Sequence, residues 1–332
     1  MLSPAPAQPA LLAEISRGPI VEARVRGHLV LVDRHGEPVR WLGDPDVEST
    51  LRSACKPLQA ASFVESGTAA ALGLGRESIA IACSSHQGEP GHVEAVRAIL
   101  AKAGLPESAL RCGAHLPANP EAAAQLLRGG SSPSQVHNNC SGKHSAMVAT
   151  CVHRGWPLES YLERDHPLQV EIAERIAYHA GLTPVELPFG TDGCGLPTFG
   201  MPLRAFARAL ASAASSDAAV QECHAAMAEY PWLIGGTTSF DTALVRAAGE
   251  SLTAKGGAAA IFGAVARDGS WALAIKLEAG NPAGLPQIAV HALQQLQLLP
   301  TRLEGELERQ VRSPITNWAG REVGEVRVQF DL

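Results

Sequence analysis

A serine and a lysine stand one helical turn apart in the segment Arg52-Ser53-Ala54-Cys55-Lys56-Pro57. On a helix, residues three apart share a face, so the Ser53 hydroxyl and the Lys56 amine could meet. A serine hydroxyl is a weak nucleophile that needs an adjacent base. A lysine amine can be that base when burial lowers its pKa. The spacing therefore predicts acyl transfer through an activated serine.

Lysine is rare in this chain, which makes each lysine informative. Of the 27 basic residues only five are lysines, so arginine supplies most of the positive charge. A lysine is ordinarily a solvated surface charge. Lys56, Lys143 and Lys255 instead stand among glycine, serine and cysteine residues, which favours a chemical role. Lys102 is typical of a helix end, where a cation suits the helix dipole.

Two polar segments that contain glycine carry further reactive groups. A thiol, two imidazoles and an amine lie between His137 and His144, and a second thiol lies in the segment 190–197. Thiolates suit Zn²⁺, so Cys140 and Cys194 could share a metal site. Each segment has only one thiol, however, so buried structural thiols and a redox pair remain alternatives. The other cysteines have apolar or helical surroundings and are predicted to be core thiols: Cys55, Cys83, Cys112, Cys151 and Cys223.

Two more polar groups follow apolar runs. Ser85 and His86 come directly after the run 78–83, which we interpret as a buried strand, and loops at strand ends often hold catalytic groups. An ordinary turn with a capping serine is the alternative. Lys255-Gly256-Gly257 ends a later predicted strand, about 200 residues after Ser53. In serine β-lactamases, a K-T-G strand faces the S-x-x-K serine in this way, but their S-D-N element has no match here.

Taken together and in this order, the motifs resemble the rhizobial-type L-asparaginases, a family unrelated to the bacterial threonine-nucleophile asparaginases. The motifs are Arg52-Ser53-x-x-Lys56-Pro57, Ser85-His86, Asn139-Cys140-Ser141-Gly142-Lys143-His144, Gly190-Thr191-Asp192-Gly193-Cys194-x-Leu196-Pro197 and Lys255-x-Gly257-Ala258. The resemblance spans roughly residues 17–281. It implies a homodimer with a serine β-lactamase/glutaminase-like fold that hydrolyses L-asparagine to L-aspartate and ammonia.

The resemblance also implies which residues act in catalysis. It pairs Ser53 with Lys56 and Ser85 with Lys255, as two Ser–Lys tandems. One serine attacks the side-chain amide carbon, backbone N–H groups hold the oxyanion, and water then releases aspartate from the acyl-enzyme. By analogy with other S-x-x-K enzymes, Ser53 is favoured as the nucleophile.

A metal site and substrate contacts are implied by the same resemblance. In the implied metal site, a zinc ion would be bound by Cys140, Lys143 and Cys194. A lysine amine must be neutral to bind a metal ion, and a coordinated cation favours that neutral form. Arg52, His144 and Asp192 would lie near the substrate. Arg52 could bind the α-carboxylate and Asp192 the α-ammonium group.

The elements that must position these groups follow from hydrophobic patterning. Strands are predicted at 20–25, 28–32, 38–42, 251–254, 260–265, 271–277 and 322–330, and helices from Ser53 and at 90–103, 170–180, 203–227 and 284–299. Strands at both ends of the chain around a helical middle predict an α+β fold, or α-β sandwich, in which helices flank one antiparallel sheet. We expect a disordered tail at 1–12 and one catalytic unit at 13–332, with a sheet subdomain (13–50 and 246–332) and a helical subdomain (51–245).

Composition limits the classes of function. The net charge of −6 with no basic block argues against nucleic acid or an anionic membrane as a partner. No 18-residue apolar run exists, and seven irregularly spaced cysteines without an export signal fit reduced thiols in the cytoplasm. The alternative functions on the same fold are a glutaminase or a penicillin-recognising acylase. Asparagine and glutamine differ by one methylene group, which changes the binding free energy by only about 1–3 kcal/mol. A non-catalytic metal- or ligand-binding protein should have lost a nucleophile or base, yet all four predicted groups are present.

Overall fold

An antiparallel sheet forms the centre of the computed structural model, which describes residues 8–312 and 314–332. Within these residues its order is β12-β1-β2-β9-β8-β7, with β3 also paired to β2. The strands are β1 (Ala10–Arg17), β2 (Ile20–Asp33), β3 (Pro38–Leu42), β7 (Leu252–Gly257), β8 (Ile261–Ala266), β9 (Trp271–Leu277) and β12 (Val326–Val328). The two ends of the chain therefore build one sheet, as the sequence predicts.

Helices cover both faces of this sheet. Residues 29–32 of β2 are all buried, and because neighbouring residues in a strand point to opposite faces, neither face is open there. Helix α8 (Leu203–Ser216) packs on β8 and β9, and α11 (Leu285–Gln295) packs near β12. The remaining helices are α1 (Lys56–Glu65), α2 (Thr68–Ala71), α3 (Arg76–Ala82), α4 (Pro90–Lys102), α5 (Pro120–Arg128), α6 (Ser141–Arg154), α7 (Pro167–Ala180), α9 (Ala218–Glu229), α10 (Phe240–Ala248) and α12 (Gly305–Arg312).

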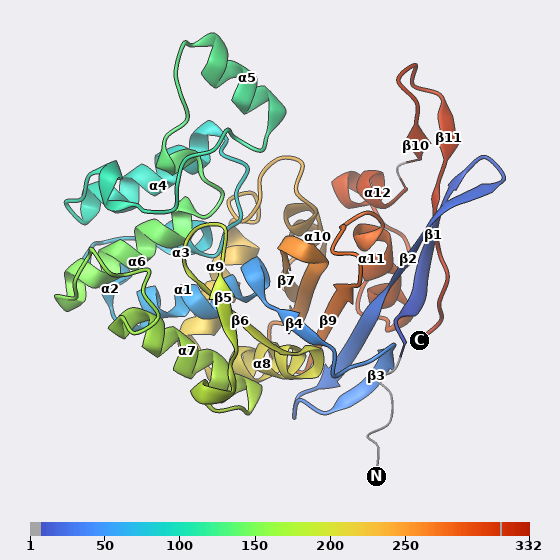
Figure 1. The fold of residues 1–332 in the computed structure, drawn as a ribbon, viewed down its shortest axis with the longest axis horizontal. Helices are drawn as coiled ribbons and strands as arrows, with labels where there is room; N and C mark the ends of the chain where they lie inside the picture. The colour runs from blue at the N-terminus through green and yellow to red at the C-terminus, as the bar shows by residue number, and fades with distance from the viewer. Residues whose placement is uncertain (1–7, 313) are drawn as a thin grey trace.

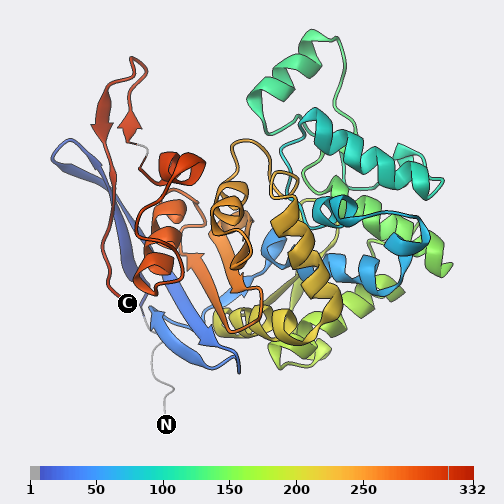
Figure 2. The ribbon, with the colours of Figure 1, turned by 180° about the vertical axis from the view of Figure 1, so that it is seen from behind.

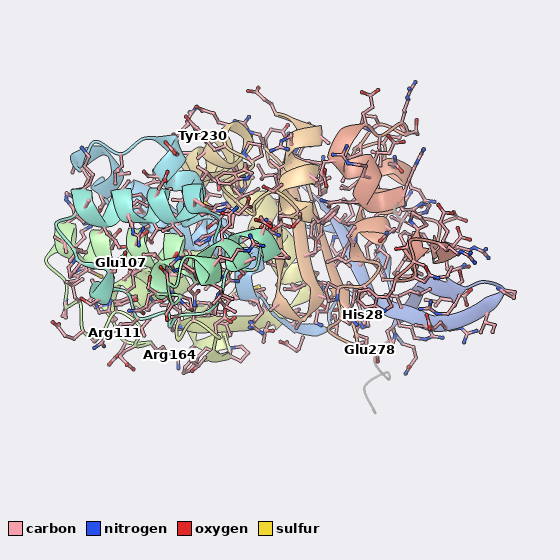
Figure 3. The ribbon with its side chains drawn as sticks, turned by 90° about the horizontal axis from the view of Figure 1, so that it is seen from above. His28, Glu107, Arg111, Arg164, Tyr230 and Glu278 are labelled. Atoms are coloured by element: carbon pink, nitrogen blue, oxygen red, sulfur yellow. The ribbon has the colours of Figure 1, made fainter. Side chains whose placement is uncertain are left out.

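The helical region lies beside the sheet (Figures 1 and 2). Figure 3 shows this division from above, with Glu107, Arg111 and Arg164 in the helical half and His28 and Glu278 in the sheet half. Two smaller strand groups complete the fold. One is a three-stranded sheet in the order β4-β6-β5, and the other is the pair β10–β11. Their bounds are β4 (Glu48–Thr50), β5 (Phe189–Thr191), β6 (Pro197–Pro202), β10 (Ile315–Thr316) and β11 (Glu322–Gly324).

The structure corrects the predictions for the first part of the chain. Residues 1–7 of the predicted disordered tail lie outside the described residues, but β1 already begins at Ala10 because Leu12 is fully buried in the core. The predicted turn between 20–25 and 28–32 is absent there, because Arg26 and Gly27 stay paired with β1. The two predicted strands are one strand, β2.

Other predictions are corrected in the middle and at the end of the chain. The run 78–83, interpreted as a strand, forms the end of helix α3 and its C-cap Cys83, because a short run of buried residues fits either periodicity. The polar segment 190–197 spans the end of β5, the hairpin tip at residues 192–196 and the start of β6. The predicted strand 322–330 is divided into β11 and β12. In the described part of the chain, no helix is both long and apolar enough to cross a bilayer.

Candidate active site

A cleft of about 1100 Å³ lies at the end of the sheet, next to β7 and the helical region. The predicted residues in its wall are Arg52, Ser53, Ser85, Cys140, Asp192, Cys194 and Lys255. They come from segments spread over 200 residues, so the fold brings together what the motifs suggested. Lys56 and Lys143 are buried behind this wall and contact residues that line it.

Ser53 lies in the 3₁₀ turn Arg52–Cys55, which leads directly into α1. Arg52 has a φ of 46°, an unusual value for a residue with a side chain. Such strain costs about 1–3 kcal/mol and persists where the surrounding structure imposes it, often at active sites. Strand β7 comes very close to this turn. A Cβ atom on Gly257 would lie 3.0 Å from the Ala54 nitrogen, so glycine is required for Ser53 and β7 to face each other.

Lys56 has a fully buried amine that is surrounded by acceptors. Its Nζ donates to the Ser85 hydroxyl (3.0 Å), to the Ser84 carbonyl and to Cys140 Sγ (3.3 Å). Burial is the largest influence on the pKa of Lys56 and lowers it, while the nearby Cys140 sulfur opposes this shift. Lys56 therefore has the properties of a general base. Among the described residues its serine partner is Ser85, not Ser53 as the tandem pairing predicted.

Lys255 is bound elsewhere than predicted. Its amine forms a buried ion pair with Asp241, which lies at the start of α10, and also donates to the Gly256 carbonyl (2.9 Å). The second carboxylate oxygen of Asp241 accepts the Gly256 N–H at 3.0 Å. Asp241 thus fixes both the amine and the backbone of β7, and Ser85 is not the partner of Lys255 in the described structure. The sequence contains no motif that links Asp241 to Lys255.

Arg52 and Asp192 form a two-point ion pair at the rim of the cleft. Asp192 Oδ1 accepts from Arg52 Nε at 2.8 Å and from Nη2 at 2.7 Å. Burial acts to raise the pKa of Asp192, but the hydrogen bond from Arg52 and the charge of Lys143 outweigh it and lower that pKa. The site therefore offers a fixed cation and a fixed anion side by side, which suits the carboxylate and ammonium groups of an amino acid.

Cys140 and Cys194 meet, although they come from different segments. Cys140 caps α6 and Cys194 lies at the β5–β6 tip. A hydrogen bond from the Cys194 thiol lowers the pKa of Cys140 well below its usual value, which favours the thiolate form of Cys140. Lys143 Nζ lies 3.8 Å from Cys194 Sγ. Burial alone would lower the pKa of Lys143, but the two sulfur groups outweigh burial and raise it.

The two sulfurs and the Lys143 amine fit the zinc ligands implied by the resemblance. In a tetrahedral site with Zn–S of about 2.3 Å and Zn–N of about 2.0 Å, ligand atoms lie roughly 3.5 Å apart, close to the N–S distance seen here. Neither here nor elsewhere among the described residues does a group of three or more His, Cys, Asp or Glu side chains form that could hold a metal ion. A site here therefore depends on the Lys143 amine, which must lose its proton on binding.

His144 does not line the cleft. It is fully buried, and its Nδ1 shares a hydrogen bond of 2.7 Å with the Tyr161 hydroxyl. Burial lowers the pKa of His144 well below its usual value, which makes a neutral structural imidazole. The histidine that does line the cleft is His115, which sequence reasoning missed. Its Nε2 accepts the Asn139 N–H at 3.0 Å and so holds the backbone next to Cys140.

The sequence profile described as L-asparaginase II matches residues 13–328. No curated protein matches the chain. Among solved structures, the chain is similar to one described as Mglu in its tris and glutamate form, with 14% identity over 90% of this chain and 65% of that chain and a TM-score of 0.45. This chain thus spans less than two thirds of that one.

Two further chains of solved structures are similar over 90% of this chain. One is described as Mglu, with 14% identity over 73% of that chain and a TM-score of 0.36. The other is Mglu in its native form, with 17% identity over 70% of that chain and a TM-score of 0.28. The profile match covers nearly the whole chain and includes every residue of the candidate site. The chain therefore belongs to the L-asparaginase II family of enzymes.

Proposed function

We propose that the protein hydrolyses the side-chain amide of L-asparagine to give L-aspartate and ammonia. The observation that carries this proposal is the buried amine of Lys56, which donates to Ser85 in a cleft that Ser53 also lines. A serine and an amine of lowered pKa are the parts that amide acyl transfer needs. The Arg52–Asp192 pair gives the cleft complementary charges for an amino acid.

In the proposed mechanism, Ser53 attacks the amide carbon. Its hydroxyl lines the cleft beside the strained Arg52 backbone, which supports a held, functional position. Lys56 accepts the proton, directly or through Ser85, and passes it to the departing ammonia. Backbone N–H groups between the Ser53 turn and β7 are the candidates to hold the oxyanion. Water then attacks the ester and releases aspartate, with Lys56 again as the base.

Lys255 has a different part in this mechanism from the one expected. Because Asp241 holds the Lys255 ammonium group in a buried ion pair, the role of Lys255 is to place positive charge beside the Gly256–Gly257 backbone rather than to deprotonate Ser85. Arg52 would bind the α-carboxylate and Asp192 the α-ammonium group of the substrate. The proposal also includes a homodimer, for which the support is the resemblance to the family alone.

The test of this function is ammonia release from L-asparagine by the purified full chain, with L-glutamine measured in parallel. We expect asparagine to be the better substrate, with kcat/KM at least about tenfold higher, because one methylene group is worth about 1–3 kcal/mol in a fitted pocket. Turnover of glutamine alone would replace the proposal with a glutaminase. Turnover of neither amide would overturn it.

We also propose that Cys140, Lys143 and Cys194 hold a zinc ion. Bound zinc would fix these side chains and supply positive charge beside the substrate. The nucleophile does not depend on it, since Lys56 already serves as a base. Metal removal is therefore expected to raise KM more than it lowers kcat.

Elemental analysis of the purified protein tests the zinc ligands. Cys194→Ala is expected to lose most of the bound zinc, because each thiolate is one of only three protein ligands. Cys151→Ala is the matched control, since Cys151 is a buried thiol on the same helix as Lys143 and lies outside the cleft. Equal zinc in the two variants would place the metal elsewhere. A chelated protein that keeps its substrate affinity but has no turnover would contradict the positioning role.

A further inference from the structure

The cleft continues past the catalytic groups into an apolar arm. We define this arm by the side chains Ile15, Phe240, Phe262, Leu285, Ile315 and Val326, all of which line the same cleft. In the sheet order, β1 is four strands from β7, so the cleft crosses roughly 19 Å at a strand spacing of about 4.8 Å. Asparagine is shorter than two extended residues, about 7 Å. The volume is also at the upper end for a drug-sized ligand.

The arm begins beside the reacting groups, at the part of β7 that faces the Ser53 turn. Phe262 is paired with Gly256 across β7 and β8, and Phe240 precedes Asp241 in sequence. The two phenyl rings have centroids 5.8 Å apart. Further lining residues of the arm come from β1, β12 and α11. In Figure 1, β1 and α11 lie on the far side of β7 from β5 and β6.

The charge distribution in the cleft is one-sided. Its acidic and basic side chains belong to Arg52, Asp192, Asp241 and Lys255, all at the catalytic end. The two amide side chains in the arm bind backbone groups. Gln287 donates to the Val311 carbonyl at 3.3 Å, and Asn281 accepts the Ala283 N–H at 2.9 Å. Among the described residues that line the arm, none is charged, so the arm favours an uncharged, apolar group.

We propose that the enzyme also hydrolyses N4-substituted L-asparagines, in which the amide nitrogen carries an apolar aryl or alkyl group. This inference rests on the proposed function, since it uses the same serine and the same amino-acid contacts. With Arg52 and Asp192 binding the α-groups, the substituent on the amide nitrogen points away from them, into the arm. The serine oxygen bonds to the carbonyl carbon as the C–N bond breaks. The serine proton goes to the leaving amine, and water releases aspartate.

The test compares N4-benzyl-L-asparagine with L-asparagine, using the full chain and measuring benzylamine and ammonia. We expect benzylamine release with a KM about tenfold below that of asparagine, because the ring buries apolar surface in the arm. Hydrolysis of asparagine without release of benzylamine would overturn this inference and leave the proposed function intact. Hydrolysis of neither compound would overturn both. Faster cleavage of L-β-aspartyl-L-phenylalanine than of the benzyl amide would show that the arm takes peptides, against the proposal.

A pair of variants on β12 tests whether the arm itself binds the substituent. Val326 lines the cleft, whereas Val328 on the same strand is similarly half-buried but does not. Val326→Asp is expected to lower the ratio of kcat/KM for the benzyl amide to that for asparagine by about tenfold. Val328→Asp is expected to leave that ratio unchanged. An equal ratio in both variants and in the parent chain would overturn the assignment of the arm.

Discussion

Ser53→Ala is expected to lower kcat for asparagine by at least about 10³-fold, because the variant lacks the hydroxyl that forms the acyl-enzyme. Ser85→Ala is expected to lower kcat by about 10²–10⁴-fold, the range for a lost proton-transfer group, since Ser85 is the hydroxyl that Lys56 reaches. Both effects should appear in kcat rather than in KM. Steady-state ammonia release measures them.

Mass spectrometry of quenched reactions separates the two serines. If Ser53 is the nucleophile, the acyl-enzyme is an aspartyl ester that increases the mass of the peptide containing Ser53. This ester should accumulate in the Ser85→Ala variant and be absent from the Ser53→Ala variant. An adduct on Ser85 in the Ser53→Ala variant would reverse the assignment. The control is Ser62→Ala, because Ser62 is a buried serine of α1 that lies outside the cleft and whose hydroxyl has no hydrogen-bond partner among the described residues. This control should keep the parent activity.

The second large effect concerns the Lys255–Asp241 pair. Asp241→Leu is expected to lower the free energy of unfolding by about 3–5 kcal/mol, because it leaves the Lys255 amine buried without its counter-ion. Lys255→Met should lower the free energy of unfolding by a similar amount, because it leaves the Asp241 carboxylate buried without its counter-ion. The double variant should regain much of the loss, since two apolar side chains can replace a buried pair. Urea unfolding of the four proteins gives the coupling free energy.

Activity distinguishes a catalytic pair from a purely structural one. The double variant should regain stability yet stay at least about 10²-fold less active than the parent, because the charge beside Gly256–Gly257 is lost. Parent-like activity in the stable double variant would show that the pair only supports the fold. Glu121→Gln provides a matched surface control. It removes an exposed ion pair with Arg128 and should change stability by less than about 1 kcal/mol.

The sequence predicted which segments meet but not which atoms bond. Strands 38–42 and 271–277 have the predicted bounds, and the profile match confirms the resemblance to the L-asparaginase family. The predicted pairing of Lys56 with Ser53 differs from the contact with Ser85 in the structure, because a lysine side chain can reach several hydroxyls and packing decides its direction. Asp241 could not be found at all, since it lies 14 residues from Lys255 and belongs to no motif.

His144 and α3 show two other limits of the sequence. His137 and His144 have the same side chain, so the sequence does not show which of them faces a cleft. The hydrogen bond to Tyr161 places the imidazole of His144 in the core. The last part of helix α3 was predicted as a strand because residues 78–82 are all buried, so no exposed polar positions reveal the helical period. Tertiary contacts decided both cases.

Strand β7 is the last strand on its side of the sheet. Such borders are ordinarily a hazard, because their free N–H and C=O groups can recruit a strand from another molecule and start aggregation. Here Asp241 takes the Gly256 N–H, and the turn that carries Ser53 lies against Gly257. The groups assigned to turnover thus also shield the border from intermolecular pairing. Substitutions that loosen them should therefore reduce solubility along with activity.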